Sequence, residues 1–483
     1  MEIYVTEISK YVITLLLFLY TLEAFLVFIR KTEEDRKGVY IRQIILMFAV
    51  QIACFVQILA RTGKAQYAFF FAFQIIIFAS VLTLFYLIYP EGNRLLINNS
   101  CMLLMIGMII LTRLSYDKAI KQFFIITASF VVGFFVPELI FRFNFLKKFT
   151  YVYAGAGIVA IGAVLILGAA THGSKISYTI AGITFQPSEF VKIVFLFFMA
   201  AALYKSESIL ELFLTSVIAA AHVIILVLSR DLGSALIFFV IYLALIYIAT
   251  ENIGYLAIGL SFGVLASVIS YKLFTHIQVR VQAFLDPFSD IERTGYQISQ
   301  SLFGISSGCW FGLGLYGGSP QSIPYVERDF IFSAIAEELG VLFAIFMALI
   351  CVSTFIMLMV EGYYIRDKFY RLIITGVAVA YIFQTFLTIG GGAKFIPLTG
   401  VTLPLVSYGG TSVFVTVFMI MISEGVCMIR VDEEYELEER RRKRARQQRR
   451  LDRDQTYRKE TYRQEDTGRD GRSQEYTKRQ KTN

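Results

Sequence analysis

Long apolar runs follow one another along most of this chain, and each has about the length that crosses a bilayer as a helix. None reads like a barrel strand, and in hydrocarbon a helix satisfies its own backbone hydrogen bonds. The pattern predicts an all-α polytopic membrane protein. We place thirteen spans at residues 9–29, 41–60, 67–89, 97–112, 121–141, 149–170, 186–204, 209–228, 232–250, 253–273, 330–360, 371–390 and 405–429.

One connection differs from the others. Residues 275–329 mix Asp, Glu, Arg, Gln, Ser, Gly and aromatic residues without a long apolar run. Connections between elements usually have about 4–6 residues, so this loop is far longer than normal. It ends in Glu327-Arg328-Asp329, immediately before the apolar segment that begins at Phe330. A polar loop of this kind beside a membrane is where we expect chemistry.

Composition excludes a soluble protein, since 57% of the 483 residues are hydrophobic and only 17% are charged. The net charge is +8, and residues 431–483 carry +4 of it as the difference between 17 basic and 13 acidic residues. This tail starts with a sequence that could form a charged helix, but it cannot bury enough apolar surface to fold alone. We expect a disordered, solvated tail near anionic lipid, with a dedicated partner site as the alternative.

Basic residues indicate which ends of the spans face the cytoplasm. They gather after the first, fifth and eleventh spans, and with thirteen spans these connections and the tail fall on one side. By the positive-inside rule that side is cytoplasmic, so the N-terminus and residues 275–329 face outward. Arg113, Lys118 and Lys121 depart from this rule.

Cysteine and histidine offer little chemistry. The five cysteines are scattered without a close pair, which favours neither a disulfide framework nor a zinc site. With only three histidines, a multi-histidine metal site is disfavoured.

The sequence FQPSE at residues 185–189 opens the seventh span, with Lys192 one turn further on. Proline suits the first turn of a helix, and Glu189 there is favoured by the helix dipole and can pair with Lys192 at i, i+3. A helix start would explain most of this pattern. Charged groups at the edge of a span are nevertheless costly, which makes both residues functional candidates.

The ninth span starts within SRDLGS at residues 229–234. Ser229 could cap this helix and Asp231 could simply complement its dipole, or these residues could take part in a site. The glycines of the long loop do not form a dinucleotide fingerprint, because no strand precedes them. They are consistent with ordinary loop chemistry.

Asp329 has two interpretations as well. It could be only the N-cap of the helix from Phe330. A carboxylate at the membrane boundary with a cation beside it can also be held ionised and act as a general base. Glu337 lies at i+8 and would share the Asp329 face of one continuous helix.

Residues 398–412, LTGVTLPLVSYGGTS, enter the last span. Gly409 and Gly410 permit close helix packing or a local break in the helix. Ser407 and Thr411 place polar groups on one face, which favours a lined cavity.

Together these segments resemble the SEDS family of membrane proteins, which includes FtsW, RodA and SpoVE. The resemblance covers residues 97–430. The matching residues occur in the order of the family: 185–189 with Lys192, 231–234, 286–287 with 295–297 and 300–301, 329–332 with 337–340, and 404–410.

This resemblance implies a ten-helix core that polymerises the lipid-linked disaccharide-pentapeptide precursor of peptidoglycan, together with a class B penicillin-binding protein. The essential aspartate of the family falls on Asp329. Family positions important for structure or activity fall on Glu189, Lys192 and Asp231. The further substrate-binding or supporting candidates are Arg280, Gln297, Gln300, Arg328, Ser407, Gly409 and Gly410.

Three positions depart from the family pattern. Ile176-Ser177 stands where the family usually has Arg-Trp, PYVER at residues 324–328 replaces Pro-Glu-Ala-His-Thr, and Thr388 replaces an asparagine. These departures affect expected substrate contacts and the choice of paralogue.

We therefore expect three parts: an extension of about three helices at residues 1–96 that is dispensable for chemistry, a core at 97–430, and the tail at 431–483. The expected activity is polymerisation of lipid II on the outer face of the bacterial cytoplasmic membrane. Asp329 would be the base, and Lys192, Arg280, Arg328 or a divalent cation such as Mg²⁺ or Mn²⁺ would stabilise the leaving diphosphate. The alternatives are a lipid II flippase and a non-catalytic scaffold for the transpeptidase. We expect no nucleic-acid partner.

Overall fold

The computed structural model describes residues 2–30, 32–167, 169–171, 174–180, 183–206 and 208–479. The first half of the chain contains α1 (Glu2–Ile29), α2 (Glu33–Thr62), α3 (Ala65–Ile88), α4 (Arg94–Leu114), α5 (Tyr116–Gly133), α6 (Val136–Arg142), η1 (Asn144–Lys148), α7 (Thr150–Leu167), α8 (Pro187–Leu203), α9 (Ile209–Leu228) and α10 (Leu232–Thr250). The second half contains α11 (Ile253–Leu273), α12 (Thr275–Leu285), α13 (Tyr296–Gly308), η2 (Pro320–Ser322), α14 (Ile331–Leu339), α15 (Val341–Tyr364), α16 (Lys368–Gly392) and α17 (Gly410–Arg479).

The predicted all-α fold class is confirmed, and every predicted span overlaps one or two helices. Among the described residues, eleven helices are long and apolar enough to cross a membrane, and Thr150–Ile166 is a shorter apolar helix. The fifth span consists of α5 and α6 in succession. The sequence did not predict the three short antiparallel strands β1 (Ala169–Thr171), β2 (Ser174–Ile180) and β3 (Ile183–Phe185), which connect α7 to α8.

The predicted span at 330–360 is wrong as one continuous helix. The structure divides it into α14 and α15 at Gly340, whose φ is +95°. A Cβ on Gly340 would stand 2.5 Å from the carbonyl oxygen of Trp310, so the preceding loop occupies the space that a side chain needs. Only glycine combines this backbone angle with so close a contact. Because α14 begins only at Ile331, Asp329 lies outside the helix, and it does not share a helix face with Glu337.

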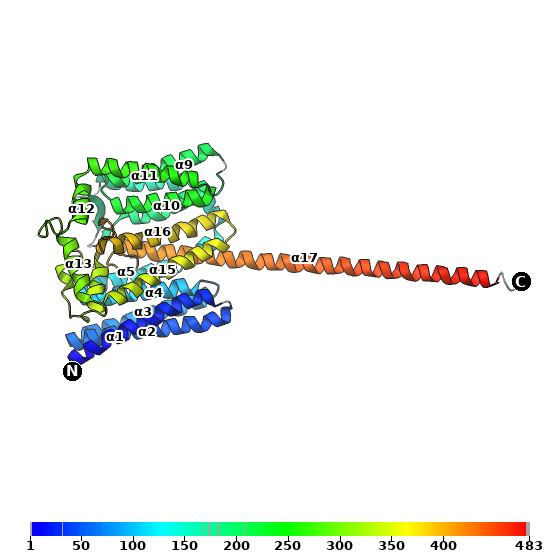
Figure 1. Cartoon of the computed structure of the whole chain (residues 1–483), viewed down its shortest axis with the longest axis horizontal. Helices are drawn as coiled ribbons and strands as arrows, with labels where there is room; N and C mark the ends of the chain where they lie inside the picture. Colours follow the sequence, from blue (N-terminus) through cyan, green and yellow to red (C-terminus); the bar gives the residue numbers. More distant parts are fainter. Residues whose placement is uncertain are drawn as a thin grey trace. The chain divides into compact units, whose positions relative to one another are not determined.

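The N-terminus, α12 and α13 lie at the same end of the bundle (Figure 1). This agrees with the expectation that residues 1–8 and the long loop face the same side. Two basic residues that departed from the charge rule have acidic partners at this end: Arg113 pairs with Glu338 and Lys118 with Glu327.

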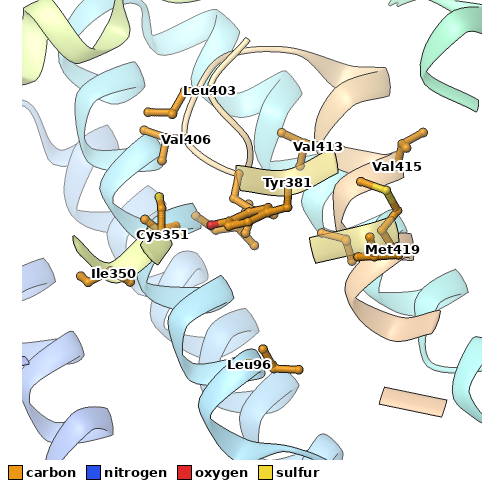
Figure 2. Close-up of a cluster of buried hydrophobic side chains, with 14 of the residues drawn as sticks. Leu96, Ile350, Cys351, Tyr381, Leu403, Val406, Val413, Val415 and Met419 are labelled. Atoms are coloured by element: carbon orange, nitrogen blue, oxygen red, sulfur yellow. The ribbon is translucent and has the colours of Figure 1, made fainter. Parts of the chain in front are cut away.

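The interior is organised around α4, in which an apolar stretch of 18 residues is entirely buried inside the protein. Figure 2 shows part of this core, in which Tyr381 of α16 lies near Cys351 of α15, residues 403 and 406 of the last loop, and α17. The bundle comprises residues 1–429, and residues 430–483 form a second unit.

Residues 430–479 are helical, whereas the sequence analysis expected a disordered tail that could begin as a charged helix. Ion pairs at i, i+4, such as Arg440 with Glu436 and Lys443 with Glu439, run along this segment. Such pairs favour a helix locally by a few tenths of a kcal/mol each, so they account for the helix without a packed core.

Candidate functional site

Asp329 lies in the turn before α14, at the end of the long loop. The N-cap position of α14 is occupied by Phe330, and no side chain caps the helix. Among the described residues, no hydrogen bond reaches the Asp329 carboxylate, while its backbone N–H donates to the Tyr325 carbonyl at 3.2 Å. The geometry therefore does not support Asp329 as a simple helix cap.

Two arginines, Arg328 and Arg280, lie close enough to Asp329 for their charges to lower its pKa. The Cβ position of Gly400 stands 3.8 Å from Asp329 Oδ2 and 3.7 Å from Arg280 Nη2, so these two atoms are at most about 7.5 Å apart, the sum of both distances. Arg280 is fixed by donating from Nη1 to the carbonyls of Leu398 and Thr399 at 3.1 and 3.0 Å. Arg280 and Asp329 thus both lie beside Gly400, in the loop that precedes α17.

The pKa of Asp329 reflects these neighbours. Burial raises its pKa to about 6, although the charges of Arg328 and Arg280 lower it and Glu327 raises it further. Part of the side chain remains exposed. A carboxyl group with a pKa near 6 is ionised at neutral pH and is still a better proton acceptor than an ordinary aspartate.

Glu327 has a different environment from Asp329. It forms an ion pair with Lys118 of α5. Burial tends to raise the pKa of Glu327, but the hydrogen bond from Lys118 and its charge bring this pKa below its usual value. Glu327 is thus a carboxylate that is paired with a lysine of the same chain.

The loop before α17 clamps the backbone in front of Asp329. Ser407 Oγ donates to the Arg328 carbonyl at 2.5 Å, and the Tyr408 N–H donates to the Glu327 carbonyl at 2.7 Å. Gly409 continues this loop, where its N–H donates to Gln122 at 3.4 Å, and Gly410 is the first residue of α17. Ser407 therefore acts on Asp329 through the main chain.

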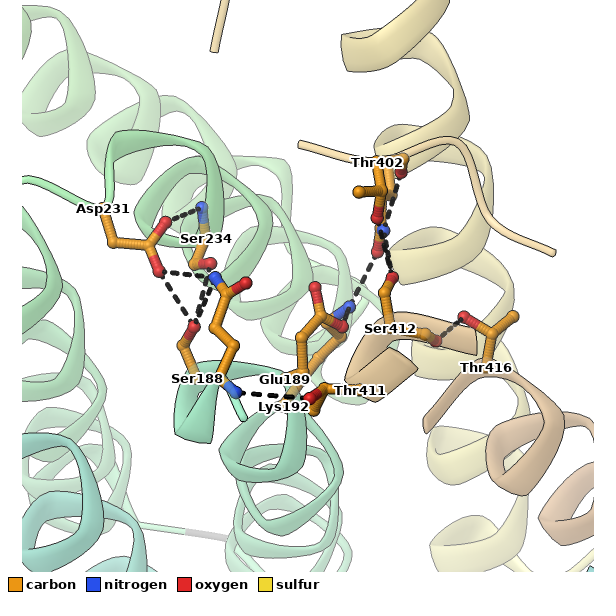
Figure 3. A network of polar contacts seen from close by, with 11 residues as sticks. Ser188, Glu189, Lys192, Asp231, Ser234, Thr402, Thr411, Ser412 and Thr416 are labelled. Atoms are coloured by element: carbon orange, nitrogen blue, oxygen red, sulfur yellow. Dashed lines mark hydrogen bonds and ion pairs between the residues drawn. The ribbon is translucent and has the colours of Figure 1, made fainter. Parts of the chain in front are cut away.

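Glu189 and Lys192 lie in a second cluster, shown in Figure 3. Lys192 Nζ, with its side chain 1% exposed, lies 2.8 Å from Glu189 Oε2 and donates to Gln384 Oε1 at 2.7 Å. Gln384 donates in turn to the Thr402 carbonyl at 3.0 Å and to Ser412 Oγ at 3.3 Å. A buried ion pair of this kind needs such additional hydrogen bonds to offset the cost of desolvation. The cluster joins α8, α16 and α17.

Asp231 caps α10 and also holds α8 in place. Its Oδ1 accepts from the Ser234 N–H at 3.2 Å, and its Oδ2 accepts from Ser188 Oγ at 2.8 Å and from Gln186 Nε2 at 3.2 Å (Figure 3). The sequence analysis assigned the cap to Ser229, but Ser229 ends α9 and Asp231 is the N-cap of α10. The same carboxylate fixes the start of α8 against the start of α10.

Residues 398–412 connect the two clusters. Gly400 lies beside Asp329 and Arg280, whereas Thr402 and Ser412 contact Gln384. Gln384 was missed by the sequence analysis, although a glutamine inside an apolar span is itself a signal of a buried polar contact.

Gln297 and Gln300 lie on α13, are half-exposed and make no side-chain hydrogen bond to the described residues. Their neighbour Ser301 is the group that connects elements here: its Oγ donates to the Gly392 carbonyl at 2.7 Å and lies 2.6 Å from Ser333 Oγ. Ser301 therefore holds α13 to α14 and α16, leaving both glutamine side chains available.

The residues beside Asp329 do not make a metal site of their own. In the described part of the chain, no group of three or more His, Cys, Asp or Glu side chains could hold an ion. The charges that face Asp329 are largely arginines, and Glu327 is paired with Lys118. A divalent cation would need the phosphate oxygens of a substrate as further ligands.

Comparison with known proteins places these features in a family. Residues 93–430 match the FtsW/RodA/SpoVE family model, described as cell cycle protein. The peptidoglycan glycosyltransferase RodA of Mycobacterium tuberculosis is 33% identical over 296 residues, which cover 57% of this chain and 63% of that protein. The match thus spans less than two thirds of the length of this relative. The probable peptidoglycan glycosyltransferase FtsW of Aeromonas salmonicida is 31% identical over 57% of this chain and 71% of its own length.

Solved structures share the fold. The rod shape determining protein RodA of Thermus thermophilus has a TM-score of 0.54 and 21% identity, covering 70% of this chain and 97% of that one. A chain from a peptidoglycan synthase complex has a TM-score of 0.60 and 23% identity, covering 70% and 98%. Eleven described helices are long and apolar enough to cross a membrane, and the ordered motifs and these matches agree with them. The chain belongs to the FtsW/RodA/SpoVE family and is a multi-pass protein of the cytoplasmic membrane.

Proposed function

We propose that this protein is a peptidoglycan glycosyltransferase that polymerises lipid II on the outer face of the membrane. The observation that carries the proposal is the Asp329 carboxylate, which faces Arg280 and Arg328 and has no hydrogen-bond donor among the described residues. The names of the relatives support the same reaction class.

In the proposed reaction, Asp329 takes the proton of the 4-hydroxyl group on the acceptor GlcNAc. The hydroxyl oxygen attacks the anomeric carbon of the donor MurNAc, and the bond from that carbon to the diphosphate oxygen breaks with inversion. The electron pair leaves with undecaprenyl diphosphate. Positioned acid–base groups contribute about 10²–10⁴-fold to such steps.

The departing diphosphate needs a cation. Lys192 is disfavoured for this role, because it is buried and committed to Glu189 and Gln384. Arg280 is favoured, because its Nη2 lies near Asp329 while its Nη1 is held by two carbonyls. A preorganised cation stabilises developing charge without reorganisation during the reaction. We assign no step to a metal ion, because the side chains around Asp329 do not supply a ligand set.

We propose a class B penicillin-binding protein as the partner that cross-links the product. This rests on the family resemblance, and the structural similarity to a chain from a peptidoglycan synthase complex is consistent with it.

The test is an assay of the purified protein with lipid II, alone and with a class B penicillin-binding protein, followed by gel analysis of glycan chains. Polymerase function predicts glycan chains from the wild type and none from Asp329→Asn. Movement of lipid II across proteoliposome membranes without glycan chains would favour a flippase. Neither chains nor movement, with partner binding intact, would favour a scaffold.

A further inference from the structure

The first three helices, α1–α3, precede the family match, which begins at residue 93. They are nevertheless joined to the core by buried side-chain hydrogen bonds. Asn98 Nδ2 of α4 donates to Gln43 at 2.9 Å, and Tyr20 of α1 donates to Asn99 of α4 at 3.1 Å. Amides buried among membrane helices have no water available as a hydrogen-bond partner. These contacts therefore fix α1–α3 in one register against the core.

The same helices reach the outer end of the bundle, where residues 309–319 connect α13 to η2; we call this segment the glycine loop. One side of the glycine loop is bonded to α14. The N–H groups of Leu313 and Gly314 donate to the carbonyls of Glu337 and Glu338 at 3.0 and 2.8 Å. The Ser319 N–H donates to Glu337 Oε1 at 2.7 Å.

Arg113 at the end of α4 secures this arrangement. Its Nη2 lies 2.8 Å from Glu338 Oε1, and it also donates to the Gly318 carbonyl at 3.3 Å. The guanidinium stands 4.3 Å from the centre of the Tyr316 ring. Both members of the ion pair are buried, so they hold the glycine loop and α14 together in a dry environment.

The other side of the glycine loop contacts α1 and α2. Gln57 of α2, 1% exposed, accepts a hydrogen bond at Oε1 from the buried Leu315 N–H at 3.3 Å. Its Nε2 donates to Ser9 of α1, which orients the amide. Tyr11 of α1 packs on Phe311 with ring centres 4.9 Å apart. The glycine loop is thus held between the N-terminal helices and α14.

The short helix α14 links this contact to Asp329. It has nine residues, all of them buried, and begins two residues after Asp329. A buried helix in a close-packed interior moves as a unit rather than deforming. A displacement of the glycine loop against α14 therefore reaches the backbone that carries Asp329.

We propose that α1–α3 position the active-site aspartate, and that Gln57 is the positioning residue through which α2 holds the glycine loop against α14. The kinetic part of this inference rests on the proposed polymerase function. It gives residues 1–96 a part in chemistry, in contrast to the expectation from the sequence that they are dispensable.

Gln57→Met tests this, because methionine keeps the length of the side chain and removes the acceptor for Leu315. The matched control is Gln51→Met: Gln51 lies on the same helix, is fully buried and pairs with Gln74 at 3.1 Å, away from the glycine loop. Full-length variants are compared for kcat and KM with lipid II, and by amide hydrogen exchange over residues 309–340.

We expect Gln57→Met to lower kcat by about tenfold with KM unchanged, since a misplacement of about 1 Å at a reacting group costs up to 10²-fold. Amide exchange should rise in the glycine loop and α14 for Gln57→Met and stay at the wild-type level for Gln51→Met. Equal losses in both variants, or wild-type exchange in Gln57→Met, would overturn the inference.

The two proposals fail separately. If the wild type makes no glycan chains, the polymerase assignment is lost, whereas the exchange measurement still decides whether Gln57 holds the glycine loop. If the wild type polymerises and Gln57→Met does so at the same kcat, only the positioning role is lost.

Discussion

Asp329 lies two residues before α14 and Glu338 lies in its last turn, and their surroundings differ in kind. Glu338 is 1% exposed, is paired with Arg113 and accepts the Tyr316 N–H at 3.1 Å. Asp329 is partly exposed and faces two arginines, yet no hydrogen-bond donor among the described residues reaches it. A carboxylate whose acceptors are satisfied by the protein holds structure together, whereas one whose acceptors are free can receive a proton from a substrate.

The largest effect is expected for Asp329→Asn. Asparagine keeps the size of the side chain but does not accept the proton, so polymerisation should fall by about 10²–10⁴-fold. Fluorescence size-exclusion profiles and partner binding should match the wild type. Near-normal polymerisation by this variant would remove the distinction between Asp329 and Glu338, and Asp290 or Glu189 would become the candidates for the base.

Arg280→Gln should lower kcat by about 10²-fold, the loss typical of removing one preorganised charge-stabilising donor. Polymerisation by purified protein measures this effect. The double variant with Asp329→Asn tells whether the two residues act together, because residues that act as a unit are strongly non-additive. Fully additive losses would place Arg280 outside the reaction.

Glu338→Gln should lower the stability of the fold more than it lowers catalytic activity. Removing one partner of a buried ion pair leaves Arg113 uncompensated, which typically costs about 3–5 kcal/mol. Thermal unfolding in detergent should show a lower Tm, and the activity per folded molecule should fall less than in Asp329→Asn. A normal Tm with a large loss of kcat would show that Glu338 serves chemistry.

Glu327→Gln is expected to have the smallest effect. The Lys118–Glu327 pair is partly exposed, and such pairs contribute about 0–1 kcal/mol. Polymerisation should stay within about threefold of the wild type. A loss as large as that of Asp329→Asn would move the base to Glu327.

The sequence predicted the parts of this molecule that depend on local pattern. Apolar length indicated where the helices lie, although the span predicted at 330–360 is two helices, and motif order singled out Asp329, Glu189, Lys192 and Asp231. The helix start at this point was also predicted, although Asp231 rather than Ser229 is the cap.

Contacts between distant segments could not be predicted in this way. Arg113 and Glu338 are 225 residues apart in the chain, and Gln57 and Leu315 are 258 apart. The break at Gly340 depends on the approach of Trp310, which no local pattern records. Because the loop that brings Gly400 beside Arg280 and Asp329 follows α16, this part of the candidate site depends on tertiary packing.

The protonation of Asp329 is the most direct test. With its pKa raised to about 6, the ionised form predominates above pH 6, so kcat/KM should be level near pH 7.5 and fall about tenfold per pH unit below pH 6. Arg280→Gln removes a charge that lowers this pKa and should move the acid limb to higher pH. Glu327→Gln removes a charge that raises it and should move the limb to lower pH. An acid limb near pH 6 that shifts in these two directions is the predicted result; a profile that is flat from pH 7.5 to 5, or a limb that neither variant moves, would contradict Asp329 as the base.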